Sequence, residues 1–258
     1  MYKGKKIAVV VPAYNERELI TQVITTMPDY VDRIYAVNDA STDDTGEILS
    51  NLAKKINRLT AINHEKNGGV GAAIMSGHKM ALKDEMDVVA VMAGDGQMDP
   101  AILDKIIDPV VEGRADFAKG DRLSVARHRE SMSAWRTFGN FILTFLTRIA
   151  SGYWHMVDPQ NGYTAISREL LQRLDLNKVD RGFAFENDQL VKLNVLGARL
   201  VDVPHPAIYG QERSKIRYHK YIVNTSMALL KLFLWRLKAK YVDRMLFGKR
   251  SGEDFAKM

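Results

Sequence analysis

The sequence predicts an α/β domain built on a mostly parallel, doubly wound sheet with flanking helices. Short β-branched runs recur along the first 115 residues, and helix-length amphipathic segments separate them. Such alternation requires crossover connections, which favour parallel pairing and place ligands at the carboxyl ends of the strands. With 258 residues, of which 46% are hydrophobic, the chain is long enough to bury a substantial core.

The first half alternates regularly between strands and helices. The predicted strands are 7–12, 33–38, 59–63 and 88–92, and the predicted helices lie near 16–27, 43–56, 70–83 and 99–112. Polar residues and glycines follow the strands in four loops, at 12–16, 38–41, 67–71 and 94–97. Each loop alone is consistent with an ordinary turn or helix cap. Because parallel strands end at the same edge of a sheet, the four loops together indicate a ligand-binding crevice.

The second half is less regular. We expect a strand at 116–119, an amphipathic helix over 133–150, a short strand at YTAIS, a helix over 183–196 and a helical tail over 221–247. The chain then divides into a regular α/β half at 1–115, a less regular half of the same domain at 116–220, and a basic apolar tail at 221–258. One face of the 133–150 helix packs either in the core or on a membrane surface, and it carries Trp135, Phe138, Ile142, Phe145 and Ile149.

Composition narrows the choice of partners. The absence of cysteine excludes disulfides and cysteine nucleophiles, and the net charge of +6 suits nucleic acid, anionic lipid or phosphorylated small molecules. Aromatic residues do not alternate with the basic ones as a stacking surface requires, so we expect no nucleic-acid partner. No signal-peptide apolar region and no uncharged run of about 18 residues is present. We therefore expect a cytoplasmic protein that does not cross the bilayer.

Two residues are candidates for holding a metal ion. Asp95 and Gln97 lie on a tight turn, Gly-Asp-Gly at 94–96, directly after a predicted strand. Their oxygens suit Mg²⁺ or Mn²⁺, which take few protein ligands and leave positions for diphosphate oxygens. Asp39 follows the second strand, where it either accepts hydrogen bonds from a ribose or base or caps the 43–56 helix.

The glycine-rich segment 67–71 opens a predicted helix, so its backbone N–H groups are candidates for facing an anion. It lacks the Lys-Ser of a P-loop and the spacing of a dinucleotide fingerprint, which argues against an ATPase or a dehydrogenase. Glu186 and Asp188 form a close acidic pair at a predicted helix start. The pair either supplies a general base or is an ordinary favourable charge near the helix dipole.

Basic residues gather in two further segments. These residues either bind phosphate groups or form a solvated basic face. The first segment contains Arg122, Arg127, Arg129 and Arg136, and the second contains Arg213, Lys215 and Arg217.

Five segments together resemble one family: VVVPAYNE, VNDASTDDT, EKNGGVGAA, VMAGDGQMDP and FAFENDQL. The combination is similar to the inverting GT-A glycosyltransferases that include dolichol-phosphate mannose synthase and related polyprenyl-phosphate sugar synthases. The resemblance implies a GT-A, Rossmann-like fold. It also implies metal-dependent transfer of a hexose or N-acetylhexosamine from a UDP- or GDP-sugar to a polyprenyl or dolichyl phosphate.

Together with the residues above, the resemblance implies individual roles. The donor would contact Pro12, Tyr14, Glu16, Asp39, Asn67, Gly71 and Asp95. The metal, Mg²⁺ or Mn²⁺, would rest on Asp95 and Gln97. Catalysis would involve Asp95, Arg122, Glu186 and Asp188. The acceptor and its phosphate would contact Arg136, Gln160, Asn161, Arg213, Ser214 and Lys215, with Asp158 in the loop that shapes the sugar pocket.

Two features depart from the family pattern. The metal turn of the family usually reads Asp-X-Asp, whereas Ala93 occupies its first position here, so the ion would bind less tightly or rest on Asp95, Gln97 and the diphosphate alone. In place of the C-terminal membrane helices of many relatives this sequence has a basic tail. We therefore expect peripheral attachment to the cytoplasmic face of a membrane. Transfer to a glycan hydroxyl and a catalytically silent nucleotide-binding subunit are the alternatives.

Overall fold

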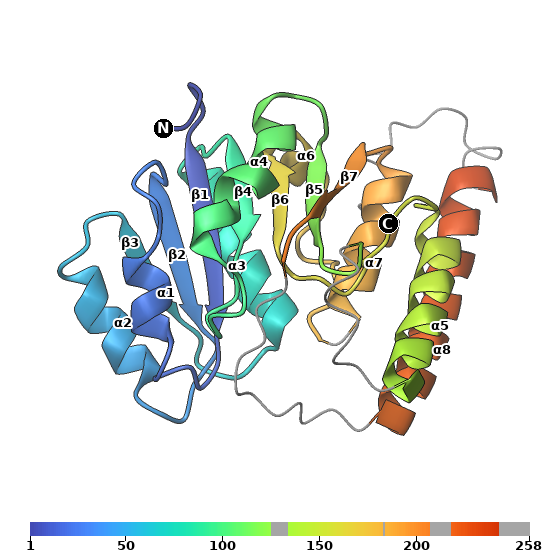
Figure 1. Ribbon diagram of the computed structural model, residues 1–258, viewed down its shortest axis with the longest axis horizontal. Coiled ribbons are helices and arrows are strands. Elements are labelled where there is room, and N and C mark those ends of the chain that lie inside the picture. The colour runs from blue at the N-terminus through green and yellow to red at the C-terminus, as the bar shows by residue number, and fades with distance from the viewer. Residues whose placement is uncertain (125–133, 183, 207–217, 243–258) are drawn as a thin grey trace.

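The computed structural model describes residues 1–124, 134–182, 184–206 and 218–242. In this part of the chain, seven strands form one mixed sheet in the order β3-β2-β1-β4-β6-β5-β7 (Figure 1). The strands are β1 (Ile7–Ala13), β2 (Arg33–Asn38), β3 (Leu59–Asn63), β4 (Val88–Val91), β5 (Phe117–Asp121), β6 (Thr164–Ser167) and β7 (Leu200–Pro204). Strands β1 to β4 pair in parallel, β6 runs antiparallel to β4 and β5, and β5 pairs in parallel with β7. The predicted mostly parallel α/β sheet is confirmed.

Helices cover both faces of this sheet (Figure 1). They are α1 (Ile20–Thr25), α2 (Thr45–Ala53), α3 (Val70–Lys83), α4 (Leu103–Val111) after a 3-10 turn at Pro100–Ile102, α5 (Ala134–Ser151), α6 (Arg168–Arg173), α7 (Phe185–Val195) and α8 (Tyr218–Leu237). In β1, Val9 and Val11 pack with residues of α1, α2 and α4, while Ala8 and Val10 pack with residues of α3, α6 and α7. Burial on both faces explains why β1 is a continuous apolar run instead of an alternating one.

Three elements of the structure differ from the predicted ones. The helix predicted near 16–27 begins only at Ile20. Asn15 has a positive φ of 59°, and the N–H of Glu16 donates to the Thr45 hydroxyl at 2.9 Å, so the chain between β1 and α1 forms a loop. Helix α6 and strand β7 were not predicted, since β7 interrupts its apolar pattern with Asp202 and ends on a proline.

Helices α5 and α8 pack side by side at one edge of the molecule and both contact α7 (Figure 1). Ala150, Val191 and Leu229 form the core that the three helices share. Leu143 on α5 is buried, whereas Phe145, in the apolar stripe predicted for this helix, is 49% exposed. Part of that stripe therefore faces outward. None of the helices described is long and apolar enough to cross a membrane.

A buried histidine makes stability depend on pH. His78 on α3 is 1% exposed, and neither ring nitrogen has a hydrogen-bond partner in the described part of the chain. Burial lowers its pKa to about 3, whereas an unfolded chain protonates histidine near 6.5. Below that value the unfolded state binds the proton and the native state does not, so stability falls as the pH falls from 6.5 towards 3.

The variant His78→Leu removes this proton linkage. Between pH 7 and pH 5 we expect it to lose about 2 kcal/mol less unfolding free energy than the wild type, as measured by urea denaturation. His155→Asn, at an exposed position, is the control and should keep the wild-type pH dependence. Equal pH dependence in His78→Leu and the wild type would show that His78 does not carry this linkage.

Candidate active site

The loops after β1, β2 and β4 meet at one edge of the sheet, as predicted, and enclose a pocket of about 510 Å³ together with the start of α3. We call it the strand-end pocket. Its lining includes Pro12, Tyr14, Glu16, Asp39, Asn67, Gly69, Ala93, Asp95 and Gly182. Six of the seven residues predicted for donor contact therefore line one cavity, and Gly71 does not.

Asp39 holds the glycine loop at the wall of this pocket. Its carboxylate is 3% exposed and accepts hydrogen bonds from the backbone N–H groups of Gly68 at 2.9 Å and Gly69 at 2.8 Å. Both N–H groups are thus used inside the protein, whereas the sequence predicted that they face an anion. Asp39 makes these bonds to the glycine loop, and the N-cap of α2 is Asp44.

Two further hydrogen bonds, which the sequence did not predict, link Asp39 to His64 and His64 to Ser76. The His64 Nδ1 lies 2.7 Å from Asp39 Oδ1, and the His64 Nε2 lies 2.8 Å from the Ser76 hydroxyl. The order resembles a serine-hydrolase triad, but Ser76 sits within α3 and not on an exposed turn. The series therefore fixes the orientation of the Asp39 carboxylate. Its one sequence signal was a histidine directly after β3.

The glycines of the 67–71 loop are required by a close approach of the chain. A Cβ on Gly69 would lie 2.5 Å from the Arg181 carbonyl oxygen, and one on Gly71 would lie 2.7 Å from the Asp180 carbonyl oxygen. Gly69 also has a φ of +88°, which favours glycine. The loop is thus clamped between Asp39 and the segment that precedes α7. Gly71 contributes to the site by allowing this close packing.

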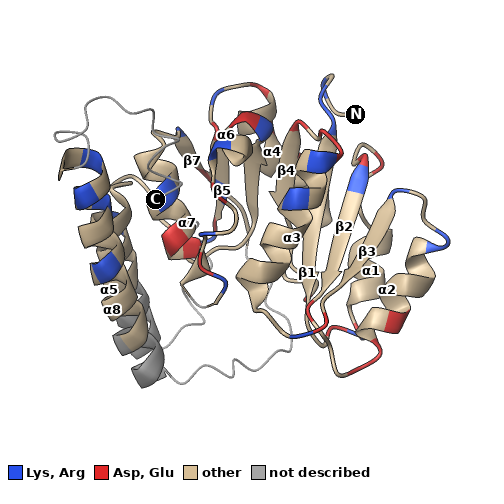
Figure 2. Cartoon of the chain, turned by 180° about the vertical axis from the view of Figure 1, so that it is seen from behind, with Lys and Arg blue, Asp and Glu red and all other residues tan. Residues whose placement is uncertain are grey.

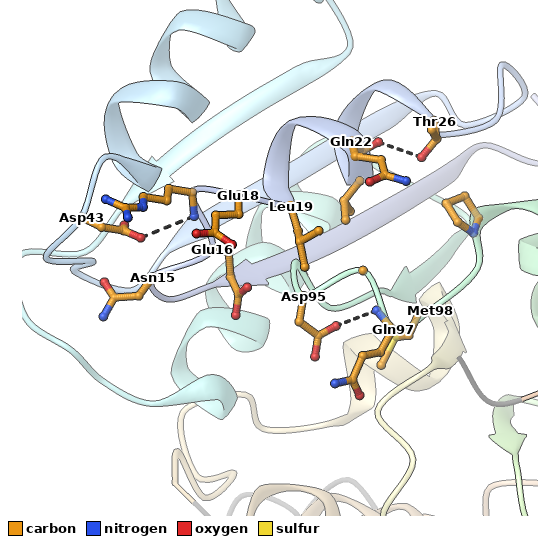
Figure 3. Close-up of a pocket in the computed structure, with 14 residues that line it drawn as sticks. Asn15, Glu16, Glu18, Leu19, Gln22, Thr26, Asp43, Asp95, Gln97 and Met98 are labelled. Atoms are coloured by element: carbon orange, nitrogen blue, oxygen red, sulfur yellow. Dashed lines mark hydrogen bonds between the residues drawn. The ribbon is translucent and has the colours of Figure 1, made fainter. Parts of the chain in front are cut away.

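The turn after β4 places Asp95 between two pockets. Asp95 and Glu16 line both the strand-end pocket and a neighbouring pocket of about 570 Å³ beside α1, which Gln97 also lines (Figure 3). Asp95 Oδ1 accepts the Gln97 N–H at 3.0 Å, so the turn holds the carboxylate in place. Asp95 and Glu16 are thus the two carboxylates that border both pockets.

Asp95 and Gln97 fit a divalent ion only in part. Within the described residues, no cluster of three or more His, Asp or Glu side chains is arranged to hold a metal. Mg²⁺ and Mn²⁺ accept one or two protein carboxylates when substrate phosphates complete the coordination. The residues present therefore suit an ion that arrives with a diphosphate, and not one held by the protein alone.

In the second half, Arg122 is paired within the protein. Its Nε donates to Asp158 Oδ2 at 2.8 Å and its Nη2 to Asp158 Oδ1 at 3.2 Å. Asn161 is 2% exposed: its side-chain amide lies 2.8 Å from His205 Nε2, and its Oδ1 accepts the Tyr163 N–H. Asn161 therefore shapes the 157–163 loop from inside and does not face an acceptor.

The acidic pair of α7 separates into two environments. Both carboxylate oxygens of Asp188 lie within hydrogen-bond distance of the Lys192 ammonium, and one also accepts the Asp180 N–H at 2.7 Å. Glu186 instead lines a small inner cavity with Lys119, a buried residue that sequence reasoning missed. Burial raises the pKa of Glu186, and the positive charge of Lys119 opposes that rise. Glu186 thus faces the cavity side, and Asp188 braces the start of α7.

Several predicted acceptor contacts have no described side chain. Arg213, Ser214 and Lys215 lie outside the described residues, as does the side chain of Arg136, although its backbone belongs to α5. Gln160 is described, and its amide donates to Asn187 Oδ1 at 3.4 Å. The described part of the predicted acceptor side therefore consists of Gln160 and the rest of the 157–163 loop.

Comparisons with known proteins agree with this geometry. Residues 8–175 match Glycosyl transferase family 2. The chain is 28% identical to a UDP-N-acetylglucosamine–dolichyl-phosphate N-acetylglucosaminyltransferase of Methanococcus voltae, over 80% of this chain and 87% of that protein. It is 29% identical to the polyprenol monophosphomannose synthase of Mycolicibacterium smegmatis, over 78% and 76% of the two chains.

A solved structure supports the fold. Glucosyl-3-phosphoglycerate synthase from Mycobacterium tuberculosis, in complex with Mn²⁺, UDP and glucosyl-3-phosphoglycerate, superposes with a TM-score of 0.60 at 21% identity, over 90% of this chain and 80% of that one. A GT-A α/β fold with its pocket at the strand ends is the architecture of a glycosyltransferase. The chain belongs to glycosyl transferase family 2.

The clamp on the glycine loop predicts a selective effect on stability. Gly71→Ala should lower the unfolding free energy by about 1–3 kcal/mol, because the added Cβ meets backbone that cannot move away freely. Gly182→Ala lies in the same contact region, but its Cβ would lie 3.7 Å from Asp180 Oδ1, so we expect a change within about 0.5 kcal/mol. Denaturant unfolding of both variants measures the difference, and equal stability would contradict the clamp.

Proposed function

We propose that this glycosyltransferase moves a sugar from a UDP- or GDP-sugar to a polyprenyl phosphate. The observation that carries the proposal is the strand-end pocket, where Asp95 faces a cavity large enough for a nucleoside diphosphate. The two relatives compared above are named for transfer to dolichyl phosphate and for polyprenol monophosphomannose synthesis. Residues 1–115 hold the donor and residues 116–220 form the acceptor side.

The residues divide the work of donor binding. Tyr14 is 47% exposed on one side of the strand-end pocket and offers its ring to the base, while Asn67 and Glu16 supply polar groups for the ribose. Asp95 and Gln97 would hold a divalent ion that accompanies the diphosphate. Such an ion, Mg²⁺ or Mn²⁺, would supply positive charge that stabilises the diphosphate as a leaving group.

The reaction is a direct displacement. An oxygen of the acceptor phosphate forms a bond to the anomeric carbon while the bond to the donor's diphosphate oxygen breaks on the opposite face, so the configuration inverts. A phosphate is already ionised at neutral pH, so this acceptor needs no strong general base. Glu186 then positions groups in the pocket. A hydroxyl acceptor would instead require Glu186 to take a proton.

Helices α5 and α8 give the protein a surface suited to an anionic membrane. Segments 134–151 and 218–242 contain no Asp or Glu, and Figure 2 shows Lys and Arg along this pair of helices. Exposed apolar side chains accompany these charges, namely Phe141, Phe145, Met227, Leu230 and Leu234. Lys231 on α8 and Lys238, directly after this helix, are exposed. We propose that this surface binds peripherally to the anionic membrane that contains the polyprenyl phosphate acceptor.

Asp95→Ala tests the donor site. We expect transfer of labelled sugar to a short polyprenyl phosphate to fall at least about 100-fold, because the ligand for the diphosphate's counter-ion is lost. Asp99→Ala is the matched control from the same loop, where Asp99 accepts the Ala101 N–H at the start of a 3-10 turn. It should keep its activity within a few-fold. Wild-type turnover in Asp95→Ala would overturn the metal assignment.

The membrane surface is tested by flotation. The double variant Leu230→Ser and Leu234→Ser should bind vesicles of anionic phospholipid at least about 10-fold more weakly than the wild type, since two exposed apolar side chains are removed. Lys54→Ser with Lys55→Ser, at the distant end of α2, controls for lost surface residues and should float normally. Unchanged flotation of the leucine variant would contradict docking through α8.

A further inference from the structure

Lys119 is a buried cation whose hydrogen-bonding capacity is not used up. It lies in β5, is 1% exposed, and its ammonium donates to the carbonyl oxygen of Asn161. Among the described residues this is its only hydrogen bond, although an ammonium carries three N–H donors. The described residues therefore leave two of its N–H donors for another group.

These donors border the inner cavity. It measures about 50 Å³ and is lined by Lys119, Glu186, Thr164 and Gln189 among apolar side chains. That space suits a hydroxyl or hydroxymethyl group and is too small for a sugar ring. A cationic donor and a carboxylate acceptor thus face the same small volume.

The inner cavity adjoins the strand-end pocket. Pro12, Val70 and Ala93 line both spaces. Ala93 contributes only a methyl group at this junction, so its side chain leaves the carboxylate and the ammonium open to a group that enters from the larger pocket. A ligand in the strand-end pocket can therefore place one substituent in the inner cavity.

Stability alone does not account for this arrangement. Burial lowers the pKa of Lys119, and the nearby carboxylates of Glu186 and Asp158 oppose that shift. An apolar side chain of similar length would avoid the desolvation of the ammonium. A buried cation with open donors beside a cavity is instead typical of a binding site.

We propose that Lys119 and Glu186 form a subsite that recognises one hydroxyl-bearing substituent of the donor sugar. The Lys119 ammonium donates to the hydroxyl oxygen, and the Glu186 carboxylate accepts the hydroxyl proton in a hydrogen bond. The subsite rests on the proposed function, and it selects among sugars, whereas Tyr14, Asn67 and Asp95 hold the part that all nucleotide sugars share. Lys119 is thus a specificity-determining residue.

Calorimetric titration separates the contribution of the sugar to binding from that of the nucleoside diphosphate. The probes are UDP, GDP, UDP-glucose, UDP-N-acetylglucosamine and GDP-mannose, titrated with Mn²⁺ present. We expect Lys119→Met to bind the free nucleoside diphosphate like the wild type and the matching nucleotide sugar about 10- to 100-fold more weakly. Lys79→Met, at an exposed position of α3, is the control and should bind both normally.

Folding is followed in parallel, because a structural lysine would behave differently. The Tm of Lys119→Met should stay the same or rise, since a desolvated charge has been removed. Glu186→Gln is the second variant, and it should show the same loss confined to the nucleotide sugar. A lowered Tm with equal weakening of both ligands would overturn the subsite and assign Lys119 a structural role.

Monodeoxy analogues of the preferred donor sugar complete the test. Removing the hydroxyl that occupies the subsite should weaken binding to the wild type more than binding to Lys119→Met, because the contact with Lys119 is already absent in the variant. Additive losses for every analogue would contradict the subsite while leaving the proposed function intact. If the wild type bound none of the nucleotide sugars, the proposed function and the subsite would both be wrong.

Discussion

The carboxylate of Asp39 is the point on which the candidate site depends. It stands at the end of β2 and accepts the N–H groups of Gly68 and Gly69, which open α3. His64 and Ser76 hold it from the other side. Because an unpaired buried carboxylate is costly, these partners fix the glycine loop and the wall of the strand-end pocket together. The approach of residues 180–182 to this loop then joins the first half of the chain to α7.

The contact between residues 180–182 and the glycine loop explains how one site contains residues from both halves of the chain. Asp95 reaches the strand-end pocket from β4, whereas Glu186 reaches the adjoining inner cavity from α7. Lys119 arrives from β5, whose parallel neighbour β7 comes some eighty residues later in the sequence. Under the proposed function, different parts of the fold would contact the nucleotide and the sugar, so recognition of the shared nucleotide would be separate from selection of the sugar.

Local sequence patterns predicted the elements that such patterns control. The β-branched run of β1 and the regular spacing of the first four strands follow from burial between two helical layers, so both the sheet and its ligand-bearing edge were predictable. Lys119 was not, because a lysine in FAKGD has the appearance of a solvent-facing strand residue. Its burial depends on Asn161 and on β7, which are distant in sequence.

The contrast between Glu186 and Asp188 has the same origin. Both stand in the first turn of α7, and sequence spacing alone does not tell which one faces the cavity. The position of Lys192, four residues after Asp188, decides the matter, because it captures that carboxylate as an ion pair. Charge at a helix start was therefore predictable, and the division of roles was not.

The most direct test of lipid-phosphate glycosylation is mass spectrometry of the products. The protein is incubated with Mn²⁺ or Mg²⁺, a short polyprenyl phosphate and each of several UDP- and GDP-sugars. One donor should yield a sugar-phosphate-lipid together with an equal amount of free nucleoside diphosphate. Consumption of a donor with no glycosylated lipid, or transfer only to a hydroxyl acceptor, would contradict the lipid phosphate as acceptor.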